Sequence, residues 1–184
     1  MKFEVEQKHR VDDPDALLQK LAVRGAALGP EIEQCDTYFA HPCRDFAQTD
    51  EALRIRVVAG DCFVTYKGPK LDAATKTRRE IELPLAAGEQ HWTELLMALG
   101  FQPVRMVRKS RRPFELEHHG AIVHGAWDVV DLVGTFVELE LSADQVSLDS
   151  ARAIVKSLSD ELQLGPSERR SYLEMLLGAR GRNS

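Results

Sequence analysis

Charged residues recur two positions apart along several stretches of the chain, and this spacing has a definite chemical consequence. Side chains two apart in a β-strand lie on the same face of the sheet. Like charges at about 6.6 Å repel by roughly 2–3 kcal/mol at an effective dielectric near 20, so a buried pair needs a compensating cation. Hard divalent cations such as Mg²⁺ and Mn²⁺ prefer carboxylate oxygens. Three Glu-x-Glu pairs have this spacing: Glu4 and Glu6, Glu80 and Glu82, and Glu138 and Glu140.

Basic residues show the same spacing as the glutamates. Arg54 and Arg56 form one pair, and Lys109 and Arg111 form another. Guanidinium and ammonium groups bind phosphate oxygens. Charges of both signs in one cavity would indicate a site for a metal ion and a polyphosphate. The alternative is an antiparallel sheet with one face in water, where such charges are merely solvated.

The pattern of apolar residues predicts the elements that must position these groups. Alternation with a period of two predicts eight strands, at residues 2–11, 33–40, 52–59, 62–67, 77–83, 104–116, 121–130 and 134–141. Helical periodicity predicts four helices, from Asp13-Pro14 to Gly25, over 89–99, over 149–162, and from a Ser167 cap to Gly178. We expect a mobile loop over 68–76 and a frayed tail over 179–184. The prediction is a single domain, residues 1–178, of the α+β class.

Composition excludes several classes of protein. The 184 residues carry 24 Lys and Arg against 29 Asp and Glu, a net charge of −5, so we expect no nucleic-acid partner and no anionic membrane partner. The three cysteines form no CxxC pair, and a reducing, cytoplasmic location fits them. The first ten residues are too charged for a signal peptide, and no apolar run approaches the ~20 residues of a membrane span. We interpret His118, His119 and His124 as surface residues rather than zinc ligands.

Seven motifs in order along the chain resemble those of the CYTH superfamily, also called triphosphate tunnel metalloenzymes. The N-terminal Glu4-Val5-Glu6-Gln7-Lys8 resembles the family's ExExK signature. The later matches are Leu53-Arg54-Ile55-Arg56, Tyr66-Lys67-Gly68-Pro69, Arg78-Arg79-Glu80-Ile81-Glu82, Lys109-Ser110-Arg111, Asp128, and Gly134-Thr135-Phe136-Val137-Glu138-Leu139-Glu140. The final Ser171-Tyr172-Leu173-Glu174-Met175-Leu176-Leu177 is similar to the end of the class IV adenylyl cyclase branch. The resemblance covers nearly the whole chain.

This resemblance implies an eight-stranded antiparallel β-barrel that forms a tunnel, with helices outside it. It assigns Mg²⁺ or Mn²⁺ binding to Glu4, Glu6, Asp128, Glu138 and Glu140. It assigns the grip on a triphosphate to Lys8, Arg54, Arg56, Lys67, Arg78, Lys109 and Arg111. Glu80 and Glu82 either help at the metal or pair with basic neighbours.

The family also implies two alternative reactions on one triphosphate grip. Class IV cyclases convert ATP to cyclic AMP and pyrophosphate. Triphosphatases hydrolyse tripolyphosphate, thiamine triphosphate or a nucleotide, and in one branch a lysine–tyrosine pair is thought to activate the water. Lys67 and Tyr38 match that pair, although cyclase-like members carry a similar tyrosine. A non-catalytic sensor of polyphosphate or nucleotide is the third alternative, and the oligomeric state stays open, with a homodimer as one option.

Overall fold

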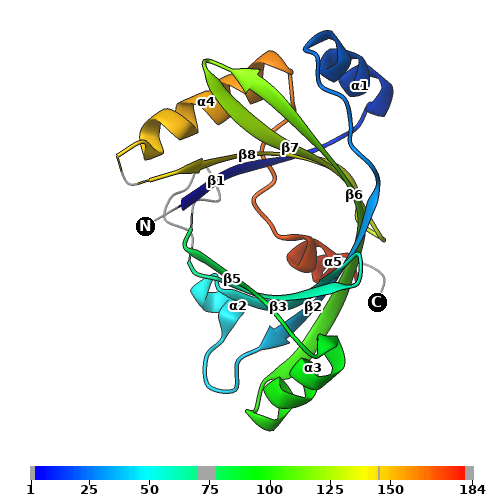
Figure 1. Cartoon of the computed structure of the whole chain (residues 1–184), viewed down its shortest axis with the longest axis vertical. Helices are drawn as coiled ribbons and strands as arrows, with labels where there is room; N and C mark the ends of the chain where they lie inside the picture. Colours follow the sequence, from blue (N-terminus) through cyan, green and yellow to red (C-terminus); the bar gives the residue numbers. More distant parts are fainter. Residues whose placement is uncertain (1–2, 70–77, 145, 181–184) are drawn as a thin grey trace.

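The backbone forms one antiparallel sheet of eight strands that curls around a central space (Figure 1). The structure, a computed structural model, describes residues 3–69, 78–144 and 146–180. The strand order in the sheet is β1-β8-β7-β6-β2-β3-β4-β5. The strands are β1 (Phe3–Arg10), β2 (Ile32–Ala40), β3 (Ala52–Val58), β4 (Asp61–Lys67), β5 (Glu80–Pro84), β6 (Gln102–His118), β7 (Ala121–Val130) and β8 (Gly134–Ala143).

The two end strands of this sheet, β1 and β5, meet where the barrel closes. Glu4 of β1 forms an antiparallel bridge with Arg78, just before β5. Seven adjacent pairs of strands form the rest of the wall, so the predicted eight-stranded antiparallel barrel is confirmed. The predicted class, α+β, is also confirmed.

The outer face of the sheet is apolar and is covered by helices. Two helices, α1 (Pro14–Val23) and α4 (Leu148–Glu161), pack on the side formed by β1, β8 and β7, around the fully buried Val5, Val137 and Val155. A third helix, α3 (Gly88–Ala98), packs against β2, β3 and β4 through Trp92 and Leu96. Because side chains alternate between the two faces, this apolar outer face leaves the charged residues on the inner one.

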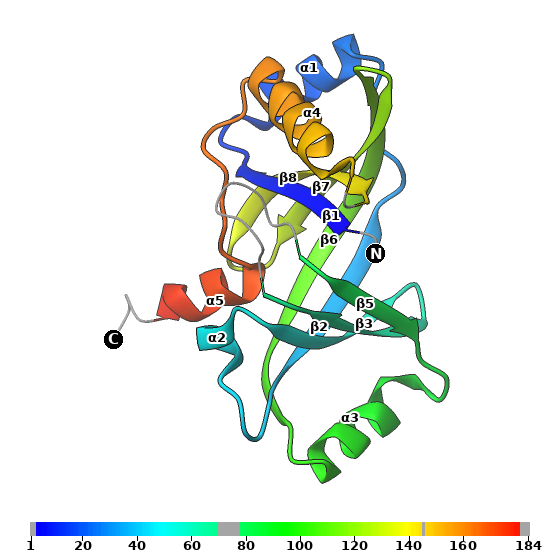
Figure 2. The same ribbon diagram turned by 90° about the vertical axis from the view of Figure 1, so that its left-hand side faces the viewer.

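Two further helices, α2 (Phe46–Thr49) and α5 (Tyr172–Arg180), lie at one end of the barrel (Figure 2). The sequence did not predict α2, because a four-residue helix shows no periodicity. Asp45 caps it by accepting hydrogen bonds from the backbone N–H groups of Ala47 and Gln48, at 3.0 and 3.4 Å.

The start and end predicted for the last helix are both wrong. Ser171, not Ser167, caps it: Ser171 Oγ accepts from the backbone N–H of Glu174, whose carboxylate accepts from the backbone N–H of Ser171. Ser167 instead pairs with His9 of β1. The helix also continues past Gly178 to Arg180. Of the remaining predictions, the loop over 70–76, Lys2, Thr77 and the tail residues 181–184 lie outside the described residues.

Candidate functional site

A cavity of about 790 Å³ occupies the inside of the barrel, and residues of α2 and α5 line one part of it. Every residue predicted for the site, except Asp128, lines it. Those residues are Glu4, Glu6, Lys8, Tyr38, Arg54, Arg56, Lys67, Arg78, Glu80, Glu82, Lys109, Arg111, Glu138 and Glu140. They come from seven strands, all but β7, and from Arg78, so the barrel collects charges that lie far apart in the sequence.

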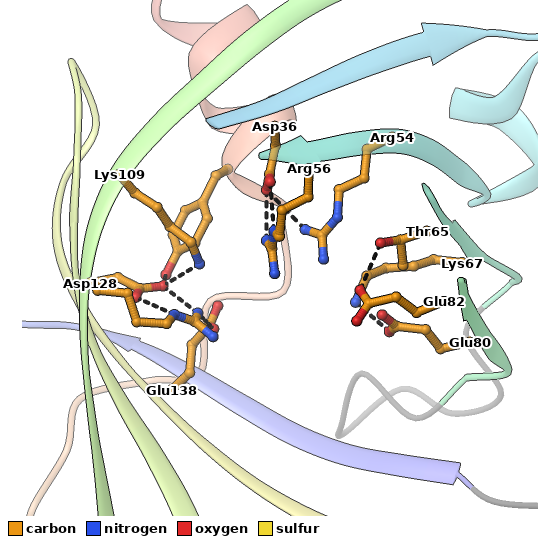
Figure 3. A network of polar contacts seen from close by, with 12 residues as sticks. Asp36, Arg54, Arg56, Thr65, Lys67, Glu80, Glu82, Lys109, Asp128 and Glu138 are labelled. Carbon is orange, nitrogen blue, oxygen red and sulfur yellow. Dashed lines mark hydrogen bonds and ion pairs between the residues drawn. The ribbon is translucent and has the colours of Figure 1, made fainter. Parts of the chain in front are cut away.

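Asp36 of β2 holds the two arginines of β3, and sequence analysis missed it as a site residue. Its carboxylate accepts from Arg56 Nε and from the second guanidinium nitrogen of Arg56, each at 2.7 Å, and from Arg54 at 3.0 Å (Figure 3). Burial disfavours the ionised carboxyl, but Arg54 and Arg56 overcome this and hold its pKa well below the usual range. Asp36 therefore stays ionised and fixes both guanidinium groups in the cavity wall.

Asp128 of β7 does the same for the basic pair on β6. Its side chain is fully buried, and it accepts from Lys109 Nζ at 2.8 Å and from two nitrogens of Arg111 at 2.7 and 2.6 Å. Arg111 also contacts Glu138. Burial, together with the charge of Arg111, lowers the pKa of Lys109 to about 8, although Glu138 and Asp128 oppose this shift. Asp128 thus lies behind the basic pair, whereas the resemblance assigned it to the metal.

The opposite wall of the cavity carries Lys67 among glutamates. Lys67 Nζ forms an ion pair with Glu80, and Thr65 donates a hydrogen bond to Glu82 at 2.8 Å. Burial raises the pKa of Glu80, but Lys67 outweighs it, so the net pKa is lowered. Figure 3 shows this group across the cavity from Lys109 and Asp128, with Arg54 and Arg56 between them in this view.

Two carboxyl groups of β1 and β8, those of Glu4 and Glu140, have raised pKa values because they are buried beside other carboxylates. Burial, followed by the charges of Glu140 and Glu80, raises the pKa of Glu4 to about 8, against the opposing effect of Lys67. Burial and the charge of Glu6 likewise raise the pKa of Glu140. A hard divalent cation would relieve this repulsion, so the donor set fits Mg²⁺ or Mn²⁺. Within the described ranges, no three such side chains already stand at coordination spacing.

Tyr38 and Lys67 occupy different parts of the site. Tyr38 is buried in a cluster with Val107 and Tyr172, and burial raises the pKa of its hydroxyl, although Arg54 opposes the shift. Tyr38 lies on β2, directly opposite Arg54 of β3. Strand β3 therefore separates Tyr38 from Lys67, which lies on β4. Tyr38 is therefore neutral at pH 7, and Lys67 is engaged by Glu80.

The mouth of the cavity differs in chemistry from its interior. Helix α2 contributes Phe46 and Ala47, helix α5 contributes Leu173 and Leu177, and Val104 lies at the start of β6. Leu177 and Val104 remain 47% and 42% exposed. The cavity therefore continues from a charged tunnel into a vestibule in which these apolar side chains lie beside the charged Arg44, Glu51 and Glu174.

Fold and site together define a barrel whose interior gathers basic side chains and carboxylates around one cavity. The CYTH domain family matches residues 2–172, and the chain belongs to this family. None of the described helices is long and apolar enough to cross a membrane.

Comparison with individual proteins gives the same family. "Putative adenylate cyclase MJ0240" from Methanocaldococcus jannaschii is 37% identical over 178 residues, covering 94% of this chain and 98% of that protein. Adenylate cyclase CyaB from Aeromonas hydrophila is 28% identical over 181 residues, covering 93% and 87%. The structure of the PH1819 protein from Pyrococcus horikoshii OT3 matches with a TM-score of 0.84 at 38% identity, covering 95% and 98%.

Proposed function

We propose that this protein is a divalent-metal-dependent adenylyl cyclase that converts ATP to cyclic AMP and pyrophosphate. The shape of the cavity carries the proposal. Inorganic tripolyphosphate needs only the charged tunnel, whereas a nucleotide also needs an apolar surface for its base. The vestibule formed by Phe46, Leu173, Leu177 and Val104 supplies that surface. The volume of about 790 Å³ lies within the usual range for a drug-sized ligand, roughly 300–1,000 Å³.

The charges of the tunnel suit the triphosphate of the same ligand. Arg54, Arg56, Lys109 and Arg111 are already oriented by buried carboxylates, so little ordering is needed when phosphate oxygens bind them. Glu4, Glu6, Glu138 and Glu140 would hold Mg²⁺ or Mn²⁺, with Glu80 close to them across the barrel seam. When bound, the metal would neutralise phosphate charge and polarise the α-phosphate.

In the proposed reaction the ribose 3′ oxygen attacks the α-phosphorus, and the bond from that phosphorus to the oxygen bridging to the β-phosphorus breaks. Pyrophosphate leaves with the electron pair of that bond, and the proton of the 3′ hydroxyl passes through solvent to the departing pyrophosphate. The fixed guanidinium groups of Arg54 and Arg56 would stabilise the charge that develops on the leaving group.

The positions of Lys67 and Tyr38 also support a binding role over activation of a water molecule. A general base must be unprotonated and within hydrogen-bond reach of the proton that it takes. Lys67 forms an ion pair with Glu80, and Tyr38 lies two strands away, with its pKa raised by burial. We therefore assign Lys67 to the phosphate grip and Tyr38 to its aromatic wall.

Product analysis tests the proposal. Purified protein would be incubated with Mg²⁺ or Mn²⁺ and, in parallel, with ATP, tripolyphosphate and thiamine triphosphate. Cyclic AMP and pyrophosphate in equal amounts are expected from ATP. Orthophosphate from any of the three would instead indicate a triphosphatase, and binding without turnover would indicate a sensor. Glu138→Gln should abolish turnover, and Glu117→Gln, at an exposed residue of β6 that does not line the cavity, should not. Full activity in Glu138→Gln would show that the assignment of Glu138 to the metal is wrong.

A further inference from the structure

Tyr172, the first residue of α5, projects into the cavity and contacts basic residues of two different strands. Its side chain is buried and lines the cavity. The reciprocal hydrogen bonds between Ser171 and Glu174 fix the first turn of the helix, and hence the point at which this ring enters the barrel. The Tyr172 ring packs edge-on against Phe136 of β8, with the ring centroids 5.3 Å apart.

The hydroxyl of Tyr172 belongs to the Asp128 cluster. It donates to Asp128 Oδ2 at 2.9 Å, the same oxygen that accepts from Lys109 and Arg111. A buried carboxylate holds a basic pair more rigidly when a third, neutral donor fixes its orientation. The hydroxyl therefore helps to set the position of Lys109 without adding a charge to the tunnel.

The face of the same ring lies under two ammonium groups. Lys8 Nζ is 4.0 Å from the ring centroid, and Lys109 Nζ is 5.1 Å from it. Both distances are within the range of a cation–π interaction. Lys8 comes from β1 and Lys109 from β6, so one aromatic ring links two strands that are not neighbours in the sheet.

The segment that leads into Tyr172 is attached to β1 at the same place. Glu168 donates its backbone N–H to the carbonyl of Lys8 at 2.7 Å, and Lys8 Nζ donates to the carbonyl of Arg170 at 2.6 Å. One residue along, the His9 imidazole contacts the carbonyl of Gly165 at 2.6 Å. The position of Lys8 therefore depends on the C-terminal segment as well as on its own strand.

We propose that Tyr172 is a positioning residue, which holds the ammonium groups of Lys8 and Lys109 where a triphosphate binds them. The identity of the ligand rests on the proposed function. The orientation of Lys8 and Lys109 by the ring is independent of the proposed function. Substitution of Tyr172 should weaken polyphosphate binding through these lysines, in excess of any loss of stability.

Calorimetric binding of tripolyphosphate without metal tests this, because it needs no turnover. Tyr172→Leu should raise the Kd about tenfold, since two cation–π contacts are lost. Tyr172→Phe keeps the ring and should raise it only about threefold. Leu176→Ala is the matched control: it truncates a buried side chain of the same helix that does not line the cavity, so it should lower the Tm and leave the Kd unchanged.

A spectroscopic readout separates positioning from packing. The chain has three tyrosines, so ring-labelled tyrosine gives three NMR signals, and Tyr172→Phe identifies the one from Tyr172. This signal should shift when tripolyphosphate draws the ammonium groups toward its oxygens. An unchanged Kd in Tyr172→Leu, or an unmoved signal on binding, would refute the positioning role and leave the proposed function standing. Failure of the unaltered protein to bind tripolyphosphate would overturn both.

Discussion

Asp36 and Asp128 have the same relationship to the site, each holding a basic pair from the neighbouring strand. Asp36 of β2 lies opposite Arg56 of β3, and Asp128 of β7 lies opposite Arg111 of β6. Both carboxylates are almost completely buried, at 2% and 0% exposure. The wall that would grip a triphosphate is therefore two strand pairs, each with a buried anion behind its cations. Such prior orientation reduces the entropy lost when phosphate binds.

Replacing Asp36 with asparagine should disorder Arg54 and Arg56 together. Removal of one partner from a buried ion pair costs about 3–5 kcal/mol of unfolding free energy, and we expect a loss near the lower limit because the amide still accepts one hydrogen bond. The Kd for tripolyphosphate should rise at least tenfold. Asp160→Asn removes an exposed carboxylate that pairs with Lys156 and should change neither quantity measurably. Denaturant unfolding and calorimetry measure both, and an unchanged Kd would contradict the role of Asp36.

Asp128→Asn distinguishes a metal ligand from a support for the basic pair. If Asp128 orients Lys109 and Arg111, the variant should bind tripolyphosphate about tenfold more weakly even without metal. The free energy of unfolding should also fall by roughly 3 kcal/mol. A metal ligand would instead lose Mn²⁺ affinity and keep its metal-free phosphate affinity. Calorimetric titrations of each ligand alone, on the unaltered protein and the variant, separate the two roles.

Alternation in the sequence predicts the fold because one property, the face on which a side chain lies, repeats along every strand. Val5, Ile55 and Val137 are apolar and pack outward, and the charged residues beside them in the chain must then face inward. Seven strands and three helices in the described ranges lie within two residues of their predicted bounds, whereas β5 begins three residues late and α5 is capped by Ser171 instead of Ser167. The inward-facing charges then need no further information to meet in one cavity.

Contacts between strands could not be predicted, because they depend on register. Asp36 appears unremarkable in the sequence, since only its position opposite Arg56 makes it a clamp. The same holds for Asp128, which the register places behind Arg111. Tyr172 is beyond sequence reasoning for a similar reason: the path of the C-terminal segment across β1 decides where its ring lies. The signal that could have revealed both contacts is a carboxylate on one strand that lies directly opposite an arginine on the adjacent strand.

A histidine cluster outside the barrel should make stability depend on pH. His118 is buried between Arg24, which donates to its Nδ1 at 3.2 Å, and Ser157, which lies 3.1 Å from its Nε2. Burial, then His119 and Arg24, lowers the pKa of His118, while Glu161 lies 3.6 Å away with the opposite charge. Because the unfolded chain takes up this proton more readily, stability should be present above about pH 6.5 and lost as the pH falls below it.

Unfolding measured between pH 5 and pH 7.5 checks this dependence. His118→Gln removes the titrating group, so its stability should fall less over that interval than that of the unaltered protein. His124→Gln is the matched control, since the His124 side chain is 59% exposed. Parallel pH profiles for the unaltered protein and His118→Gln would assign the dependence to other groups.

Glu80 competes with phosphate for Lys67, and its neutral variant should reveal this. In Glu80→Gln the ion pair is lost and Lys67 is released, so metal-free tripolyphosphate should bind about fivefold more tightly, roughly 1 kcal/mol. Glu82→Gln removes the same charge two residues away on the same strand, where the carboxylate accepts from Thr65. The difference between the two variants isolates the ion pair. Weaker phosphate binding in Glu80→Gln would show that this pair supports the grip.

Metal affinity should depend on pH through Glu4. Burial, Glu140 and Glu80 raise the pKa of Glu4 to about 8, so at pH 7 the metal must displace a proton before this carboxylate can bind it. The affinity for Mn²⁺ should therefore rise with pH by up to about tenfold per unit below pH 8, and level off above it. Glu4→Gln should bind Mn²⁺ more weakly and with a flatter profile, whereas Glu117→Gln, at an exposed residue that does not line the cavity, should match the unaltered protein. Mn²⁺ titrations followed by electron paramagnetic resonance from pH 6 to pH 9 measure this directly, and an affinity independent of pH would remove Glu4 from the metal site.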